Sequence, residues 1–175
     1  MGKNLLVYGA IPGESWDAST GVSMCGLFAY FYCTKVPGYD QQALLCASKV
    51  GSILVRMRSQ YAKQAIQAGA THLFFVDSDQ TFPPNILHRL LSWDVPIVAC
   101  NIPIKVLPST PTARNIVDGK LEVVYTKPKS TRLERVDRIG TGIMLIKTEV
   151  FSKISKPWFH NEWKPEIDDH EGEDW

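Results

Sequence analysis

The segment THLFFVDSDQTFPP, residues 71–84, constrains the fold of this 175-residue chain more than any other part of its sequence. It begins with a continuous apolar run, which is typical of a strand in a parallel sheet that is covered on both faces. Asp77 and Asp79 follow this run at once, and a Pro-Pro pair that suits the start of a helix comes next. Because ligands of open α/β sheets bind at the carboxyl ends of the strands, the two aspartates predict a ligand site.

Predicted strands and helices alternate along the chain up to residue 102, as in an α/β sheet with layered helices. Strands are predicted at residues 3–10, 42–48, 71–76 and 96–100, and helices at 52–68, at 86–92 and from a Ser19 or Thr20 cap to about Cys33. After residue 103 the pattern changes to short strands, including one at 134–139, a short helix at 147–154 and a loop rich in aromatic and acidic residues. We expect one α/β domain over residues 1–175, with a mixed, mostly parallel sheet flanked by helices and a smaller β-rich region.

The composition is typical of a soluble globular domain, with 45% hydrophobic and 21% charged residues. No apolar run approaches the length of about 20 residues that crosses a bilayer, and the N-terminus lacks the features of a signal peptide. The four cysteines show no CxxC spacing, so we expect buried thiols rather than a zinc or redox site. Thiols of this kind favour a reducing, cytoplasmic location.

The net charge of +1 hides an asymmetry between the body of the chain and its last residues. Residues 162–175 hold seven acids and one base, so residues 1–161 carry 18 bases and 11 acids. A solvated acidic tail explains this pattern, and so does a basic body that accepts a phosphorylated ligand. Nucleic acid is compatible with this charge, but the sequence has no dense basic stripe that would indicate it.

The two aspartates predict a cation site, because adjacent carboxylates are costly unless a positive charge lies between them. Their oxygens suit Mg²⁺ or Mn²⁺, which bind proteins through one or two carboxylates and the phosphates of a substrate. Asp77, Asp79 and Thr81 also match the DxDxT motif of haloacid-dehalogenase-like phosphatases, with Asp77 as the nucleophile and Asp79 as the general acid. An exposed acidic turn that caps a helix is the structural alternative.

Three blocks of the sequence resemble family-2-like GT-A glycosyltransferases, including short bacterial and phage-encoded members. They are GATHLFFVDSDQTFPPNILHRLL, VDRIGTGIMLIKTEVFSKISKPWF and HEGEDW, and they occur in the order of that family. GSILVRMRSQYAKQAI resembles a helix of the same family, although Ser59 stands where relatives often have asparagine. The resemblance implies a GT-A fold, with residues 1–102 as the nucleotide-sugar-binding half and residues 103–175 as the acceptor-side half. In relatives, more chain follows the GED motif, so we expect the family's C-terminal helix to be missing.

The resemblance implies a metal-dependent transfer of a sugar from a nucleotide-diphosphate sugar, with a UDP-sugar expected by analogy, to an acceptor hydroxyl with inversion. It assigns catalysis to Asp174 as the general base, supported by Glu173, and the metal to Asp77, Asp79 and His170. The implied donor-binding residues are Ala10, Ile11, Pro12, Arg56, Arg58, Asp77, Ser78 and Asp79. The implied acceptor-binding residues are Gly142, Trp158 and Trp163.

Each of these roles has a structural alternative. Asp174 and Glu173 also suit the first turn of a helix, where acids favour the helix dipole. His170 is also explained as a surface residue, Arg56 and Arg58 as a solvated helix face, and the tryptophans as core. A phosphatase and a noncatalytic nucleotide-sugar-binding protein remain the alternative functions.

Overall fold

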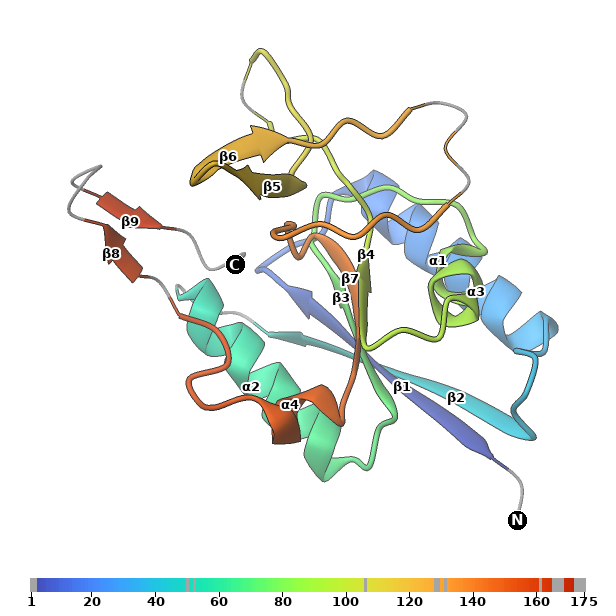
Figure 1. Ribbon diagram of the computed structural model, residues 1–175. Coiled ribbons are helices and arrows are strands. Elements are labelled where there is room, and N and C mark those ends of the chain that lie inside the picture. Colours follow the sequence, from blue (N-terminus) through green and yellow to red (C-terminus); the bar gives the residue numbers. More distant parts are fainter. Residues whose placement is uncertain are drawn as a thin grey trace.

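The computed structural model describes residues 3–49, 51, 53–105, 107–127, 130, 132–160, 162–164 and 169–171, the last two ranges by their backbone alone. A five-stranded sheet forms the centre of the fold, in the order β2-β1-β3-β7-β4 (Figure 1). Its strands are β1 (Asn4–Pro12), β2 (Gln41–Lys49), β3 (His72–Val76), β4 (Ile97–Ala99) and β7 (Ile143–Lys147). The helices are α1 (Ala18–Cys33), α2 (Leu54–Gln67), α3 (Ile86–Ser92) and α4 (Val150–Lys153).

The central sheet is mixed, as the sequence predicts, with two parallel and two antiparallel strand pairings. β1 pairs in parallel with both β2 and β3. β7 lies antiparallel to β3 and to β4, so it is the one strand of this sheet that runs in the opposite direction. Two short antiparallel pairs lie outside the sheet, β5 (Arg114–Val117) with β6 (Lys120–Val123) and β8 (Glu162–Lys164) with β9 (Asp169–Glu171).

Strand β3 is buried along its whole length, which confirms the prediction from its apolar run. Phe74 and Val76 pack on one face of the sheet with residues of α1 and α3. Leu73 and Phe75 pack on the opposite face with residues of α2 and α4. Figure 1 shows the same arrangement, with α1 and α3 on one side of the sheet and α2 and α4 on the other. This three-layer packing fixes where β3 ends and therefore where its two aspartates lie.

Helix α2 confirms most of the pattern read from its sequence. Apolar spacing predicts one buried face, and its members Met57, Tyr61 and Ala65 are buried. Ile53 and Ala68, predicted on the same face, are exposed because they flank the helix as its caps. Gly69 ends the helix as predicted, with a φ of +68° that favours glycine.

Three local predictions are wrong. Helix α1 begins after Asp17 without a side-chain cap, and the hydroxyl of Thr20 donates a hydrogen bond to the Ser78 carbonyl instead. Residues 134–139 form no strand beyond an isolated bridge between Arg138 and Arg114. Within the loop predicted after residue 156, backbone pairing forms the short β8–β9 ladder.

The expected burial of the cysteines is also wrong. Cys25, Cys33 and Cys46 are exposed, and Cys100 is partly buried. Cys25 and Cys33 lie on α1, and Cys46 lies on β2 at the edge of the sheet. Apolar neighbours in the sequence therefore did not indicate burial. No helix in the described ranges is long and apolar enough to cross a membrane.

His72, at the start of β3, predicts a pH-dependent stability. Burial disfavours its charged form and, with the nearby Lys147, lowers the pKa of His72 from 6.5 to about 4. Between these values the unfolded chain binds a proton that the folded protein does not. The free energy of unfolding should therefore fall by about 1–3 kcal/mol as the pH drops from 6.5 to 4.

Urea denaturation of His72→Gln across this pH range tests the prediction. The His72→Gln variant should lose the part of the pH dependence of the free energy of unfolding that His72 contributes. His160→Gln, at an exposed position, should keep it. Equal slopes in the wild type and in His72→Gln would contradict the account.

Candidate functional site

The turn that follows β3 carries both aspartates and is held to the neighbouring strand. The Asp77 amide donates a hydrogen bond of 2.8 Å to the carbonyl of Gly142, directly before β7. The Gln80 amide donates to the Asp77 carbonyl at 3.2 Å and closes the turn. Asp77 and Asp79 therefore lie at the carboxyl end of the central strand, where the sequence predicts them.

Asp77 forms an ion pair with a buried arginine. Nη2 of Arg58, on α2, lies 3.2 Å from Oδ1 of Asp77. The Arg58 side chain is 1% exposed, whereas that of Asp77 is 30% exposed. A buried guanidinium is stable only beside compensating negative charge, so this contact fixes one carboxylate oxygen of Asp77. The structure thus brings Arg58 into the predicted site, while Arg56 is exposed.

Asp79 pairs with a lysine that the sequence analysis did not identify. Nζ of Lys105 lies 2.6 Å from Oδ2 of Asp79, and the side-chain Nε2 of Gln80 donates a hydrogen bond to Oδ1 at 2.8 Å. Partial burial acts to raise the pKa of Asp79, but the hydrogen bonds from Lys105 and Gln80 outweigh it and lower this pKa. Asp79 is therefore a carboxylate at neutral pH, held by a lysine whose own side chain is 74% exposed.

The loop that presents Lys105 is anchored at its base. The Asn101 side chain accepts a hydrogen bond from the Ala113 amide and donates one to the Val124 carbonyl, both at 2.8 Å. Backbone hydrogen bonds from Ile104 to Thr110 and from Thr112 to Ile102 join the two arms of the loop. A pocket of about 430 Å³ lies between this loop and the turn after β3, and both Asp79 and Lys105 line it.

The loop after β1 packs against the same turn. The Ser78 carbonyl accepts hydrogen bonds from the Asp17 amide and the Thr20 hydroxyl, both at 2.9 Å. Gly13 has a φ of +142°, and a Cβ at this position would lie 3.0 Å from Oγ of Ser78. This close approach brings the β1 loop to the aspartate turn.

The predicted donor residues of β1 have buried side chains, so only their backbone is placed to meet a ligand. The side chains of Ala10 and Ile11 are fully buried, one in each core layer. The Ile11 carbonyl accepts a hydrogen bond of 3.1 Å from the Tyr61 hydroxyl, and Pro12 ends the strand. Ser78 joins the site chiefly through its carbonyl, which ties the β1 loop to the turn.

Gly142 has a steric reason to be glycine. A Cβ at this position would clash with the Ile102 side chain and would lie 3.3 Å from Oδ2 of Asp77. The backbone therefore passes directly beside the Asp77 carboxylate.

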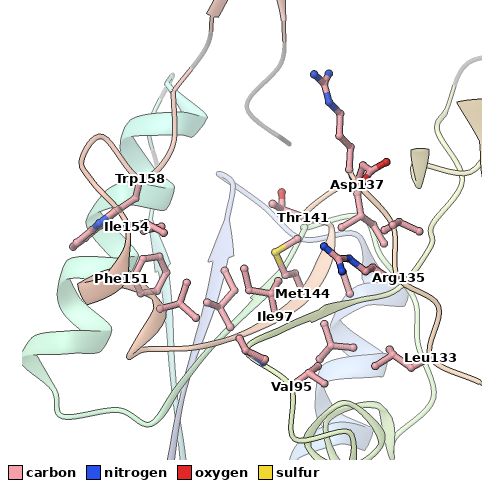
Figure 2. A pocket seen from close by; sticks show the side chains of 18 of the residues that line it. Val95, Ile97, Leu133, Arg135, Asp137, Thr141, Met144, Phe151, Ile154 and Trp158 are labelled. Carbon is pink, nitrogen blue, oxygen red and sulfur yellow. The ribbon is translucent and has the colours of Figure 1, made fainter. Parts of the chain in front are cut away.

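A larger cavity begins next to this passage. It has a volume of about 1000 Å³, and both Thr141 and Trp158 line it (Figure 2). The Trp158 ring packs against Phe151 with 5.0 Å between the ring centroids. Trp158 is thus part of the packing over α4 and part of the cavity wall, while its contact with an acceptor stays a prediction.

The remaining predicted residues lie at the C-terminal end. Trp163 and His170 pair across β8 and β9, but their side chains are outside the described residues, as are Glu173 and Asp174. The predicted catalytic pair, the His170 metal ligand and the Trp163 acceptor contact therefore stay predictions.

The described aspartates suit a cation that is shared with a substrate. Asp77 and Asp79 supply the hard oxygen ligands that Mg²⁺ and Mn²⁺ prefer, and both side chains are about one-third exposed. Within the ranges given above, no group of three or more His, Cys, Asp or Glu side chains is placed to hold a metal. The donor set fits a cation completed by phosphate oxygens better than one enclosed by protein alone.

Comparisons with known proteins bear on the fold. No protein-family model matches the chain, and no curated protein matches it either. The crystal structure of A197 from STIV is similar, with a TM-score of 0.51 and 15% sequence identity over 89% of this chain and 72% of that chain. At this identity the likeness concerns the fold alone, and it agrees with a mixed α/β sheet flanked by helices.

The two ion pairs predict unequal effects on the free energy of unfolding. Asp77→Asn should lower the free energy of unfolding by about 1–3 kcal/mol, because it removes the carboxylate charge beside the buried Arg58 guanidinium. Asp79→Asn should leave it almost unchanged, because water solvates the released Lys105. Urea denaturation of the two variants measures the difference, and equal destabilisation would show that Arg58 does not depend on Asp77.

Proposed function

We propose that this protein is a glycosyltransferase of the GT-A type that binds a nucleotide-diphosphate sugar at Asp77 and Asp79. The observation that carries the proposal is the position of these carboxylates at the end of β3, beside two basic residues and against the loop after β1. A mixed sheet with helices on both faces is compatible with a GT-A fold. The sequence blocks that resemble the GT-A family supply the reaction type.

The two aspartates take different roles in this proposal. Asp77 is fixed by Arg58 and by the Gly142 carbonyl, so it orients the turn that carries Asp79. Asp79 is held by an exposed lysine, so its carboxylate is available to a cation. When bound, Mg²⁺ or Mn²⁺ would offset the charge that develops on the departing nucleoside diphosphate.

Lys105 is the residue that the structure adds to the donor site. Its ammonium group lies against Asp79 in the same pocket and is largely exposed. A cation at Asp79 would displace this ammonium, which is then placed to bind phosphate oxygens at the mouth of the pocket. By the sequence resemblance, Asp174 removes the proton from the acceptor hydroxyl and Glu173 orients it.

Calorimetric titration with UDP, with and without Mn²⁺, tests the proposed donor site. Parallel titrations with GDP and CDP test which nucleobase the site prefers. Binding of UDP should require Mn²⁺, and Asp79→Ala should weaken it by tenfold or more, about 1.4 kcal/mol. Asp94→Ala is the matched control, because Asp94 pairs with Lys147 at 2.7 Å outside the candidate site. No nucleotide binding in any condition, together with phosphate release from a phosphomonoester that Asp77→Asn abolishes, would favour the phosphatase.

A second titration isolates the role of Lys105. Lys105→Ala should weaken the binding of UDP with Mn²⁺ by about three- to tenfold and leave UMP binding unchanged, because the ammonium group contacts the diphosphate. Lys153→Ala, which removes a lysine paired with Glu149 on α4, should affect neither ligand. Equal losses for UDP and UMP would assign Lys105 to the structure of the loop and not to the diphosphate.

A further inference from the structure

One face of the β4–β7 pair forms the floor of the largest cavity described above. Ile97 and Ala99 of β4 and Met144 and Ile146 of β7 line it. Strands β1 and β3 are covered on this side, because α2 packs on both of them. Helix α4 has only four residues, so the β4 end of the sheet is left open and Ile97 is 48% exposed. We name this cavity the β4–β7 groove.

The walls of the β4–β7 groove are also mainly apolar. Phe151 and Trp158 form one wall, and Leu133 lies on the opposite side (Figure 2). A volume of about 1000 Å³ is at the upper end of the range for pockets that enclose small ligands, which are typically apolar with a few placed polar groups. The groove therefore has the size and lining of a small-molecule site.

The charged side chains that line the β4–β7 groove differ in whether they are already hydrogen-bonded to neighbouring loops. Asp137 accepts a hydrogen bond of 2.7 Å from the Ile116 amide, and Glu134 accepts one of 3.0 Å from the Ser130 hydroxyl. Both acids are therefore engaged by neighbouring loops. Within the described part of the chain, the Arg135 side chain makes no hydrogen bond or ion pair. Figure 2 shows its guanidinium group turned toward Met144. An anion in the groove would meet a planar guanidinium fork.

We propose that the β4–β7 groove binds a small amphiphile, with its apolar body on the β4–β7 floor and a single anionic group against Arg135. A phosphate and a carboxylate share the required chemistry, since each presents oxygens to the fork of an arginine. The proposal does not depend on glycosyl transfer. If that activity is present, the occupant lies beside the donor site, because Thr141 lines the groove and the next residue, Gly142, contacts Asp77.

Titration with decyl phosphate at monomeric concentrations tests the proposal, with decanoate, decanol and inorganic phosphate as comparisons. Decyl phosphate or decanoate should bind more tightly than decanol, and inorganic phosphate alone should not bind. The stronger of the two anionic ligands identifies the head group. No binding of either one would overturn the proposal.

Two variants separate the apolar and the charged contributions. Ile97→Asp should weaken all decyl ligands by about tenfold or more, because it places a charge on the apolar floor. Arg135→Gln should weaken only the anionic ligands, by about three- to tenfold. The matched controls are Ile116→Asp, at a site 50% exposed on β5, and Arg132→Gln, at an exposed site outside the lining. Ligand binding that is unchanged in Ile97→Asp would contradict the proposal.

A measurement on the wild-type protein tests the proposal even if the variants fail to fold. In protein labelled at the methionine methyl groups, decyl phosphate should shift the NMR signal of Met144 on the groove floor. It should leave Met24 unchanged, because Met24 is a buried residue of α1, which packs on the other face of the sheet. A shift of Met24 alone, or dimerisation that Ile97→Asp abolishes without any ligand binding, would assign the open face to something other than an amphiphile.

Discussion

The buried guanidinium of Arg58 is the constraint on which the candidate site depends. A charge that is 1% exposed is costly unless a carboxylate compensates it, and Asp77 provides that carboxylate. The pair joins α2 to the end of β3, while the Asp77 amide joins the same end to the Gly142 carbonyl. Three elements from distant parts of the sequence therefore meet at one residue, and Asp79 is placed by the turn that Asp77 begins.

The second aspartate differs from the first because its partner is exposed. Lys105 is 74% exposed, so its contact with Asp79 stabilises little and is easily exchanged for another cation or for phosphate. The site thus combines a fixed carboxylate with an exchangeable one. This division is what a donor site needs, since part of it must stay rigid while another part releases its resting partner to a ligand.

The sequence predicts the elements whose signals are local. The apolar run of β3 and the spacing of Met57, Tyr61 and Ala65 on α2 are patterns within one element, and both are found in the structure. Arg58 was equally consistent with a solvated face, because its partner lies on another element. Lys105 carries no motif, and only the path of the loop from Asn101 to Ala113 brings it to Asp79.

Failures of prediction have the same physical origin. Thr20 looked like a helix cap, but its hydroxyl reaches the Ser78 carbonyl on a different segment. The sequence predicts a strand at residues 134–139, yet these residues lie along the β4–β7 groove with a single bridge at Arg138. In both cases a tertiary contact outweighed the local preference that the sequence displays.

The most direct test of the donor site is a crystal structure with Mn²⁺ and UDP, in which anomalous scattering locates the cation. The account predicts an anomalous peak within coordination distance of an Asp79 carboxylate oxygen, with the diphosphate between the peak and Lys105. It also predicts that the Arg58–Asp77 contact is unchanged. A peak away from Asp79, or a nucleotide bound elsewhere on the protein, would contradict the central claim that the end of β3 is a site for a nucleotide diphosphate.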